Sequence, residues 1–206
     1  MPSIIGIIAD KWIRAERLYG ILHLIYAGFM LLIPNLSTLQ ASFPALQQMQ
    51  EYELLYWIVF GGMLAYMPTI SLSNSVSYRI LKMNNFEVQT DFPKIRVWGT
   101  IGFIIAMWVT NLSGSKANAN QFLIAAVFAI LLGIYSFTLP KCPPQRNISK
   151  DASFIEQLGL NAFKLFANYK VALFFFFSMF LGAALQLTNM YGDSFLSGFE
   201  ADPMYK

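Results

Sequence analysis

Five apolar stretches, each near the length needed to cross a lipid bilayer, constrain what this chain can fold into. They lie at residues 18–32, 54–80, 95–112, 121–139 and 171–199. The hydrocarbon core of a bilayer is about 30 Å thick and takes roughly 20 residues of α-helix. Only 12% of the residues are charged, against about 25% in soluble domains. The sequence therefore predicts an all-α polytopic membrane bundle with about five complete transmembrane helices.

The start of the chain is apolar as well, but residues 2–9 are too few to span a membrane. They lack the basic region and the cleavage site of a signal peptide. We interpret them as the end of a further helix, a stub that precedes the five complete ones.

The lysines and arginines gather in alternate connections between the apolar stretches. Twelve of the 14 basic residues lie before the first stretch, around residues 79–96, or between residues 141 and 170. Cytoplasmic loops carry an excess of Lys and Arg. We therefore expect these three connections in the cytoplasm and the connection around Ser115 outside.

The same connections divide the chain into domains. We expect residues 1–140 to form an N-terminal transmembrane bundle, residues 141–170 a cytoplasmic linker, and residues 171–206 a helix of a second bundle. Pro143 and Pro144 open the linker, and residues 154–166 are expected to form an amphipathic helix on the membrane surface. A long linker between two helical bundles is typical of secondary transporters.

The third stretch carries an arginine near its cytoplasmic start. Thr90 or Asp91 suits the N-cap position and Pro93 suits the first turn. Arg96 then lies about one turn inside the helix. Its side chain either extends back to the cytoplasmic interface or faces a polar cavity, as charged groups at membrane depth generally do.

Two sets of polar residues share helical faces. Arg96, Thr100 and Phe103 stand at i, i+4 and i+7, and Gln186 and Asn189 stand three residues apart in the last stretch. An arginine, a hydroxyl and an aromatic ring on one face suit a polar ligand with a flat ring. The two carboxamides bind either such a ligand or a neighbouring helix.

The second stretch holds a dense group of small polar residues between residues 71 and 77, just after Pro68. Such residues either let helices approach closely and hydrogen-bond to each other or line a water-filled cavity. His23, the only histidine, serves either as a hydrogen-bonded packing residue or as a proton relay.

Several blocks of the sequence are similar to one family. Residues 6–11 (GIIADK) resemble a loop signature of the major facilitator superfamily, and residues 66–69, 75–78, 91–103, 186–190 and 202–204 resemble its nucleoside:proton symporters. The resemblance runs along nearly the whole chain, from the end of family helix 2 to just past helix 7. It implies a partial major facilitator fold and a fragment of a longer transporter.

The resemblance also implies a function and its residues. It assigns nucleoside binding to Arg96, Thr100, Phe103, Gln186 and Asn189. The proton is the coupling ion, without cofactor or metal, and the carboxylates expected to couple it lie outside this chain. The expected partners are a nucleoside and the lipid bilayer, with no nucleic acid. The expected location is the inner membrane of the cell, as a multi-pass protein.

Three further positions complete the comparison with that family. The resemblance assigns a gating or structural role in the loop to Gly6 and Asp10. From chemistry, Asp10 suits the cap of the following helix or a partner for a cation. Ala184 is a departure, because some members carry glutamate there, and any role of that carboxylate is absent here.

The sequence also allows functions other than nucleoside transport. A major facilitator transporter of a sugar or an organic acid would have the same composition, and a membrane scaffold is a further alternative. An intramembrane enzyme fits poorly, because catalysis needs a nucleophile with its base or a set of metal ligands. The chain has one histidine and one cysteine, Cys142, and we expect neither catalytic residues nor a metal site.

Overall fold

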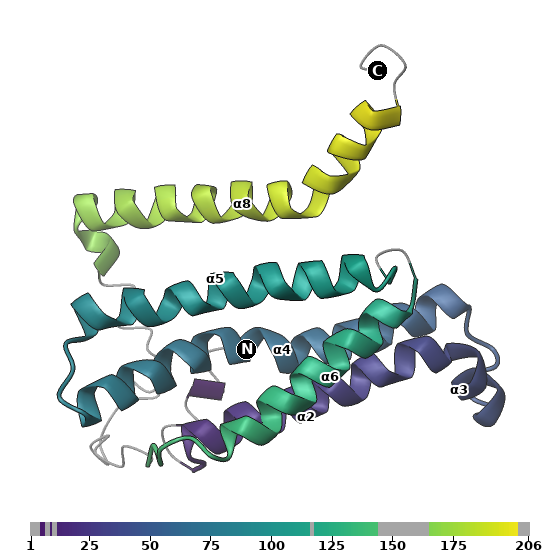
Figure 1. The fold of residues 1–206 in the computed structure, drawn as a ribbon, viewed down its shortest axis with the longest axis horizontal. Helices are drawn as coiled ribbons and strands as arrows, with labels where there is room; N and C mark the ends of the chain where they lie inside the picture. The colour runs from purple at the N-terminus through teal and green to yellow at the C-terminus, as the bar shows by residue number, and fades with distance from the viewer. Residues whose placement is uncertain (1–4, 7–8, 10–11, 116–117, 144–164, 202–206) are drawn as a thin grey trace. The chain divides into compact units, whose positions relative to one another are not determined.

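The chain folds into helices, as the computed structural model in Figure 1 shows. The structure describes residues 5–6, 9, 12–115, 118–143 and 165–201, and it contains no strand among them. The chain divides into two units, Met1–Ser149 and Lys150–Lys206. The expected surface helix at residues 154–166 lies almost wholly outside the described residues, as does Asp10.

The helices follow the apolar stretches. Their bounds are α2 (Ala15–Leu32), a 3₁₀ turn η1 (Ile33–Asn35), α3 (Leu36–Ser42), α4 (Glu51–Met83), α5 (Val88–Leu112), α6 (Asn120–Ser136) and α8 (Tyr169–Ala201). Four segments, beginning at α2, α4, α5 and α8, are long and apolar enough to cross a membrane. The fifth, α6, is apolar but has 17 residues, about 25 Å of helix. The prediction of an all-α membrane bundle is confirmed.

Helix α2 lies against both α4 and α6 in the first unit (Figure 1). Gly20 of α2 and Gly133 of α6 meet where the two helices pack closely. A Cβ atom built on Gly20 would lie 2.9 Å from the Gly133 carbonyl oxygen, nearer than van der Waals contact allows. Close by, the Ser136 hydroxyl of α6 donates a hydrogen bond to the Glu16 carbonyl of α2. Small residues therefore hold α2 and α6 together, as is usual between membrane helices.

Helix α5 is the least enclosed helix of the first unit. It packs mainly against α4, and none of its residues is buried. It begins at Val88 with Glu87 as its N-cap, so the expectation of an N-cap at Thr90 or Asp91 is wrong. Pro93 lies inside the helix instead. Proline has no backbone N–H, so the helix loses one backbone hydrogen bond. The helix tolerates this loss because the missing bond lies near the helix start.

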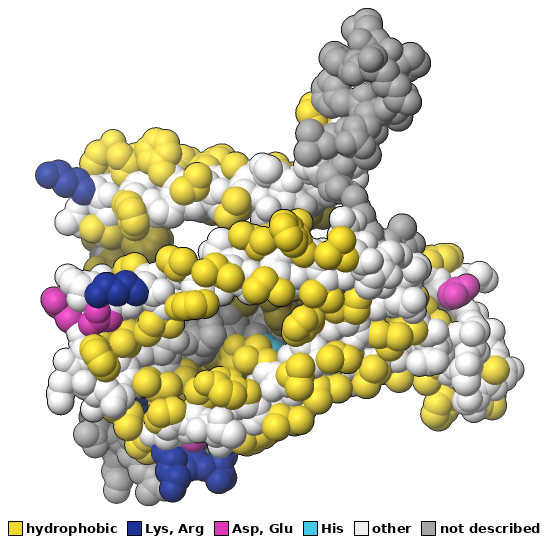
Figure 2. All heavy atoms as spheres, in the orientation of Figure 1, with side chains coloured by type: hydrophobic (Ala, Val, Ile, Leu, Met, Phe, Trp, Pro, Cys, Tyr) yellow, Lys and Arg dark blue, Asp and Glu magenta, His cyan; other side chains and the backbone are white. Residues whose placement is uncertain are grey.

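The outer surfaces of the helices are apolar. Figure 2 shows hydrophobic side chains along the helices, with Lys, Arg, Asp and Glu gathered near helix ends. Trp98 of α5 is 71% exposed and Leu112 is 82% exposed. Such exposure of large apolar side chains suits a lipid environment, because lipid tails are as apolar as these side chains.

A buried carboxylate fastens the chain after α6 to the start of α2. Glu16 is 2% exposed, and its Oε2 accepts a hydrogen bond of 3.1 Å from the backbone N–H of Cys142. Its Oε1 lies 3.2 Å from Nε of Arg14. The same stretch receives a second contact, because Nη1 of Arg79 on α4 donates to the Pro143 carbonyl at 3.0 Å. Residues 142 and 143, where the expected linker opens, are thus held at the basic end of the bundle.

Candidate functional site

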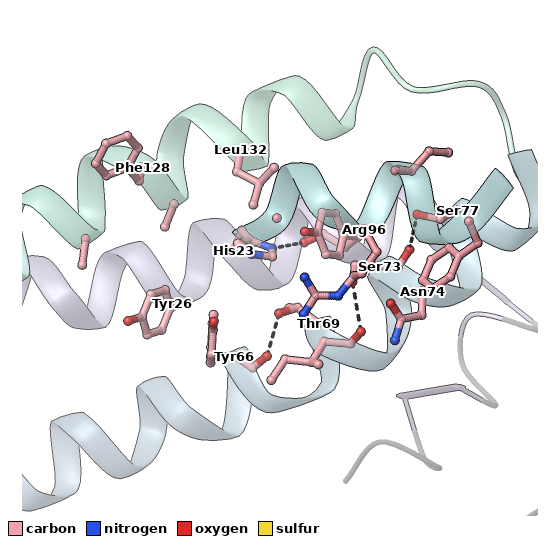
Figure 3. A pocket seen from close by; sticks show the side chains of 17 residues that line it. His23, Tyr26, Tyr66, Thr69, Ser73, Asn74, Ser77, Arg96, Phe128 and Leu132 are labelled. Atoms are coloured by element: carbon pink, nitrogen blue, oxygen red, sulfur yellow. Dashed lines mark hydrogen bonds between the residues drawn. The ribbon is translucent and has the colours of Figure 1, made fainter. Parts of the chain in front are cut away.

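A polar cavity of about 530 Å³ lies in the first unit, among α2, α4, α5 and α6 (Figure 3). Its volume is within the range of roughly 300–1,000 Å³ found for small-molecule sites. Its polar and aromatic lining comprises Tyr19, His23, Tyr26, Tyr66, Thr69, Ser73, Asn74, Ser77, Phe92, Arg96 and Phe128. Hydroxyl, imidazole, carboxamide and guanidinium groups thus meet inside an otherwise apolar bundle.

Helix α2 supplies a tyrosine–histidine stripe to this cavity. Tyr19, His23 and Tyr26 stand at i, i+4 and i+7 and so share one face. His23 is buried, and its Nδ1 donates a 3.0 Å hydrogen bond to the Tyr19 carbonyl. The ring centroids of Tyr19 and His23 lie 4.4 Å apart, and those of Tyr26 and Tyr66 5.0 Å apart. The bonded Nδ1 leaves Nε2 of a neutral ring as an acceptor.

Helix α4 supplies the small polar residues that follow Pro68. Most of their hydroxyls bond to the helix itself: Ser73 Oγ donates to the Ile70 carbonyl at 3.0 Å, and Ser77 Oγ to the Ser73 carbonyl at 2.8 Å. These hydroxyl oxygens keep lone pairs that can accept from a ligand. Asn74 has no hydrogen bond to any described residue. The cavity-lining alternative therefore holds for Ser73, Asn74 and Ser77.

Helix α5 brings Arg96 to the cavity. In Figure 3 its side chain extends between His23 of α2 and Ser73 of α4. No ion pair or hydrogen bond joins Arg96 to another described residue, although an exposed ion pair links the nearby Lys94 and Asp91 at 2.8 Å. The guanidinium therefore presents its donors to the cavity without an acceptor among the described residues.

Thr100 and Phe103 continue the face of Arg96 along α5 but do not line the cavity. Both are exposed, Phe103 to 60%. They lie farther along the helix, one and two turns beyond Arg96. The structure thus brings one of the three proposed residues of α5 into the cavity and leaves the other two at an open surface of the same helix.

Gln186 and Asn189 lie in the second unit, on α8. Both are exposed, and neither has a hydrogen bond to another described residue. The nearby Thr188 hydroxyl bonds to the Ala184 carbonyl of its own helix at 3.0 Å. The two carboxamides thus share one face of α8.

Gly6, which the sequence resemblance places in a loop, is helical and half-buried. A Cβ atom built on it would meet no described atom within 4 Å, so no close packing is seen at Gly6.

The described residues include no group of three or more His, Cys, Asp or Glu that could hold a metal ion.

Sequence reasoning missed the tyrosines of the cavity. Tyr19 and Tyr26 flank His23 at i−4 and i+3, and this spacing on an apolar helix was the signal that could have found them. Tyr66 had no such signal, because its place beside Tyr26 depends on how α4 packs against α2.

Known proteins resemble this chain over its whole length. A sequence model of the family described as nucleoside H⁺ symporter matches residues 1–204. The chain is 42% identical over 205 residues to nucleoside permease NupG of Escherichia coli (strain K12), covering 100% of this chain and 46% of the permease. It is also 42% identical to the xanthosine permease of the same organism, again over 46% of that protein.

The similarity extends to three dimensions. A crystal structure of a mutant of the nucleoside transporter NupG superposes on this chain with a TM-score of 0.76 at 41% identity, covering 100% of this chain and 48% of the other. The chain therefore spans about half the length of the relatives it matches.

Proposed function

The chain belongs to the nucleoside H⁺ symporter family, and from that membership we propose that it works as part of a longer inner-membrane transporter that moves nucleosides together with protons. The family consists of transporters, and we propose no enzymatic activity. The observation that carries the proposal is the polar cavity with Arg96 at its wall, because a guanidinium at membrane depth without an acceptor among the described residues needs another partner.

In the proposed binding mode each residue type matches a part of a nucleoside. The guanidinium of Arg96 donates to base carbonyls or ribose hydroxyls, and the hydroxyl of Thr100 donates or accepts. The carboxamides of Gln186 and Asn189 do both, which suits a ligand with donors and acceptors. The ring of Phe103 packs on the base, an arrangement that aromatic faces favour.

The domain arrangement belongs to the same proposal. Residues 1–140 supply one bundle, residues 141–170 the cytoplasmic linker and residues 171–206 the first helix of a second bundle. Alternating access moves one bundle against another around a central site. We therefore expect the 206 residues alone to accumulate no nucleoside in membrane vesicles.

Nucleoside binding and uptake by a full-length transporter that carries this segment test the proposal. Gln186→Ala and Asn189→Ala each remove a polar group that meets the ligand, which costs about 1–3 kcal/mol, or roughly 5- to 150-fold in affinity for uridine or adenosine. Arg96→Lys should also weaken binding, because lysine lacks the planar fork of donors. Gln89→Ala and Arg17→Lys are matched controls, since neither side chain lines the cavity.

Three results would decide against the proposal. If Arg96→Lys and Gln186→Ala both bind and transport like the parent, the nucleoside site lies elsewhere. If a sugar or an organic acid competes and nucleosides do not, the substrate class is wrong. If collapse of the proton gradient leaves accumulation unchanged, the proton is not the coupling ion.

A further inference from the structure

The Arg96 side chain runs in the direction opposite to the one its helix favours. In an α-helix each Cα–Cβ bond tilts toward the N-terminus, and long side chains usually lie over the preceding turn. The Arg96 guanidinium instead lies beside Gly99, three residues farther along α5. A Cβ atom built on Gly99 would be 2.6 Å from Nη1 and 3.7 Å from Cζ of Arg96. Carbon atoms in contact keep about 3.5–4.0 Å, so a methyl group at residue 99 and Nη1 in its observed position exclude each other. The end of the flexible Arg96 side chain would have to move.

This direction carries the charge toward the middle of the membrane. Helix α5 begins at Val88, on the side that the basic residues place in the cytoplasm. At 1.5 Å per residue Arg96 lies about 12 Å along the helix and Gly99 about 16 Å, in a helix about 37 Å long. A side chain that extended to the cytoplasmic interface would turn back toward Val88. The guanidinium therefore remains at the depth of the cavity.

Close helix packing does not explain Gly99. Apart from its two chain neighbours and its own helix backbone, a Cβ atom built on this residue would have only Arg96 atoms within 4 Å among the described residues. Gly20 and Gly133 differ, because their nearest atoms belong to the opposing helix. Gly102, one turn beyond Gly99 on α5, has no described atom within 4 Å of such a Cβ. A methyl group at residue 99 would therefore meet the Arg96 side chain, and Gly102 is the matched control.

We propose that Gly99 is a positioning residue for nucleoside binding: its missing Cβ lets the Arg96 guanidinium lie forward along α5 into the cavity. The inference rests on the proposed function, in which Arg96 contacts the nucleoside. Gly99 lines the cavity beside Arg96, and a methyl group there displaces the guanidinium from the position in which it meets the ligand.

The test compares Gly99→Ala, Gly102→Ala, Arg96→Ala and the double variant Arg96→Ala/Gly99→Ala in a full-length transporter that carries this segment. Uridine and adenosine affinities are measured on the purified proteins, and melting temperatures check folding. Alanine favours helix more than glycine does, so neither glycine variant should melt earlier than the parent. We expect Gly99→Ala to weaken binding by roughly 5- to 150-fold, the range for a polar group deprived of its partner, and Gly102→Ala to bind like the parent.

The double variant separates positioning from a general structural effect. If Gly99 acts through Arg96, the double variant binds no more weakly than Arg96→Ala alone, because residues that act on one interaction are not additive. An additional loss in the double variant overturns the inference, and so does a Gly99→Ala variant that binds like Gly102→Ala. In either case a weak Arg96→Ala variant still leaves the proposed function standing. If Arg96→Ala binds like the parent, both the inference and the role of Arg96 are refuted.

Discussion

Replacement of Glu16 by glutamine should release the chain that follows α6. In the parent the Glu16 carboxylate is buried and accepts the Cys142 backbone N–H at 3.1 Å. It also lies 3.2 Å from Arg14, whose side chain is 25% exposed. Glu16→Gln keeps the shape and an acceptor oxygen but removes the charge. The substitution therefore weakens the contact at residue 142 without leaving a large cavity.

The magnitude follows from the difference between a charged and a neutral hydrogen bond. Hydrogen bonds to charged groups contribute about 1.5–3 kcal/mol and neutral ones about 0.5–1.5 kcal/mol, and the ion pair adds little because Arg14 is partly in solvent. The resulting loss of about 1–1.5 kcal/mol raises the population of a locally opened state by roughly 5- to 13-fold, since about 1.4 kcal/mol is a factor of ten. The opened state exposes Cys142, which is fully buried in the parent.

Alkylation of the Cys142 thiol by N-ethylmaleimide measures this opening. Cys142 is the chain's single cysteine, so a transporter that carries this segment and no other cysteine reports on it alone. Burial, and after it the charge of Glu16, raises the pKa of the Cys142 thiol. Glu16→Gln removes the second cause, so the thiol pKa falls and the reactive thiolate becomes more abundant at neutral pH. Both effects accelerate labelling, and labelling should quicken further as the pH rises toward the thiol pKa.

Glu51→Gln is the control, because Glu51 is an exposed carboxylate in the first turn of α4 and far along the chain from Cys142. It should label at the parent rate. If Glu16→Gln also labels at the parent rate, the Glu16–Cys142 contact does not hold the chain after α6, and the reasoning is refuted.

Three other predictions concern topology, packing and the loop. A membrane-impermeant maleimide should label Asn118→Cys but not Asn85→Cys in intact cells, and the reverse pattern would invert the orientation given by the basic residues. Gly133→Leu should destabilise the α2–α6 contact by about 1–3 kcal/mol through overpacking, seen as a lower melting temperature, whereas Gly28→Leu, with open space around its Cβ, should not. Asp10→Asn should lower the transport rate more than nucleoside affinity, and unchanged values of both would leave the loop without a role in transport.

The sequence by itself determined where the helices lie and on which side of the membrane their connections are expected. Hydrophobic length and the distribution of Lys and Arg act locally, so both can be read along the chain without knowledge of contacts. Periodicity likewise placed Arg96, Thr100 and Phe103 on one face. Periodicity did not show which part of that face meets other helices. In the structure Arg96 lines the cavity, whereas Phe103 remains at an open surface.

Tertiary structure alone decided which distant residues meet. Tyr66 joins Tyr26 because α4 packs on α2, and Glu16 reaches Cys142 across 126 residues of sequence. The forward direction of Arg96 also has no signal in helical periodicity, since a helix by default turns that side chain the other way. Contacts of this kind depend on how the helices pack against one another, and packing cannot be derived from hydropathy or residue spacing.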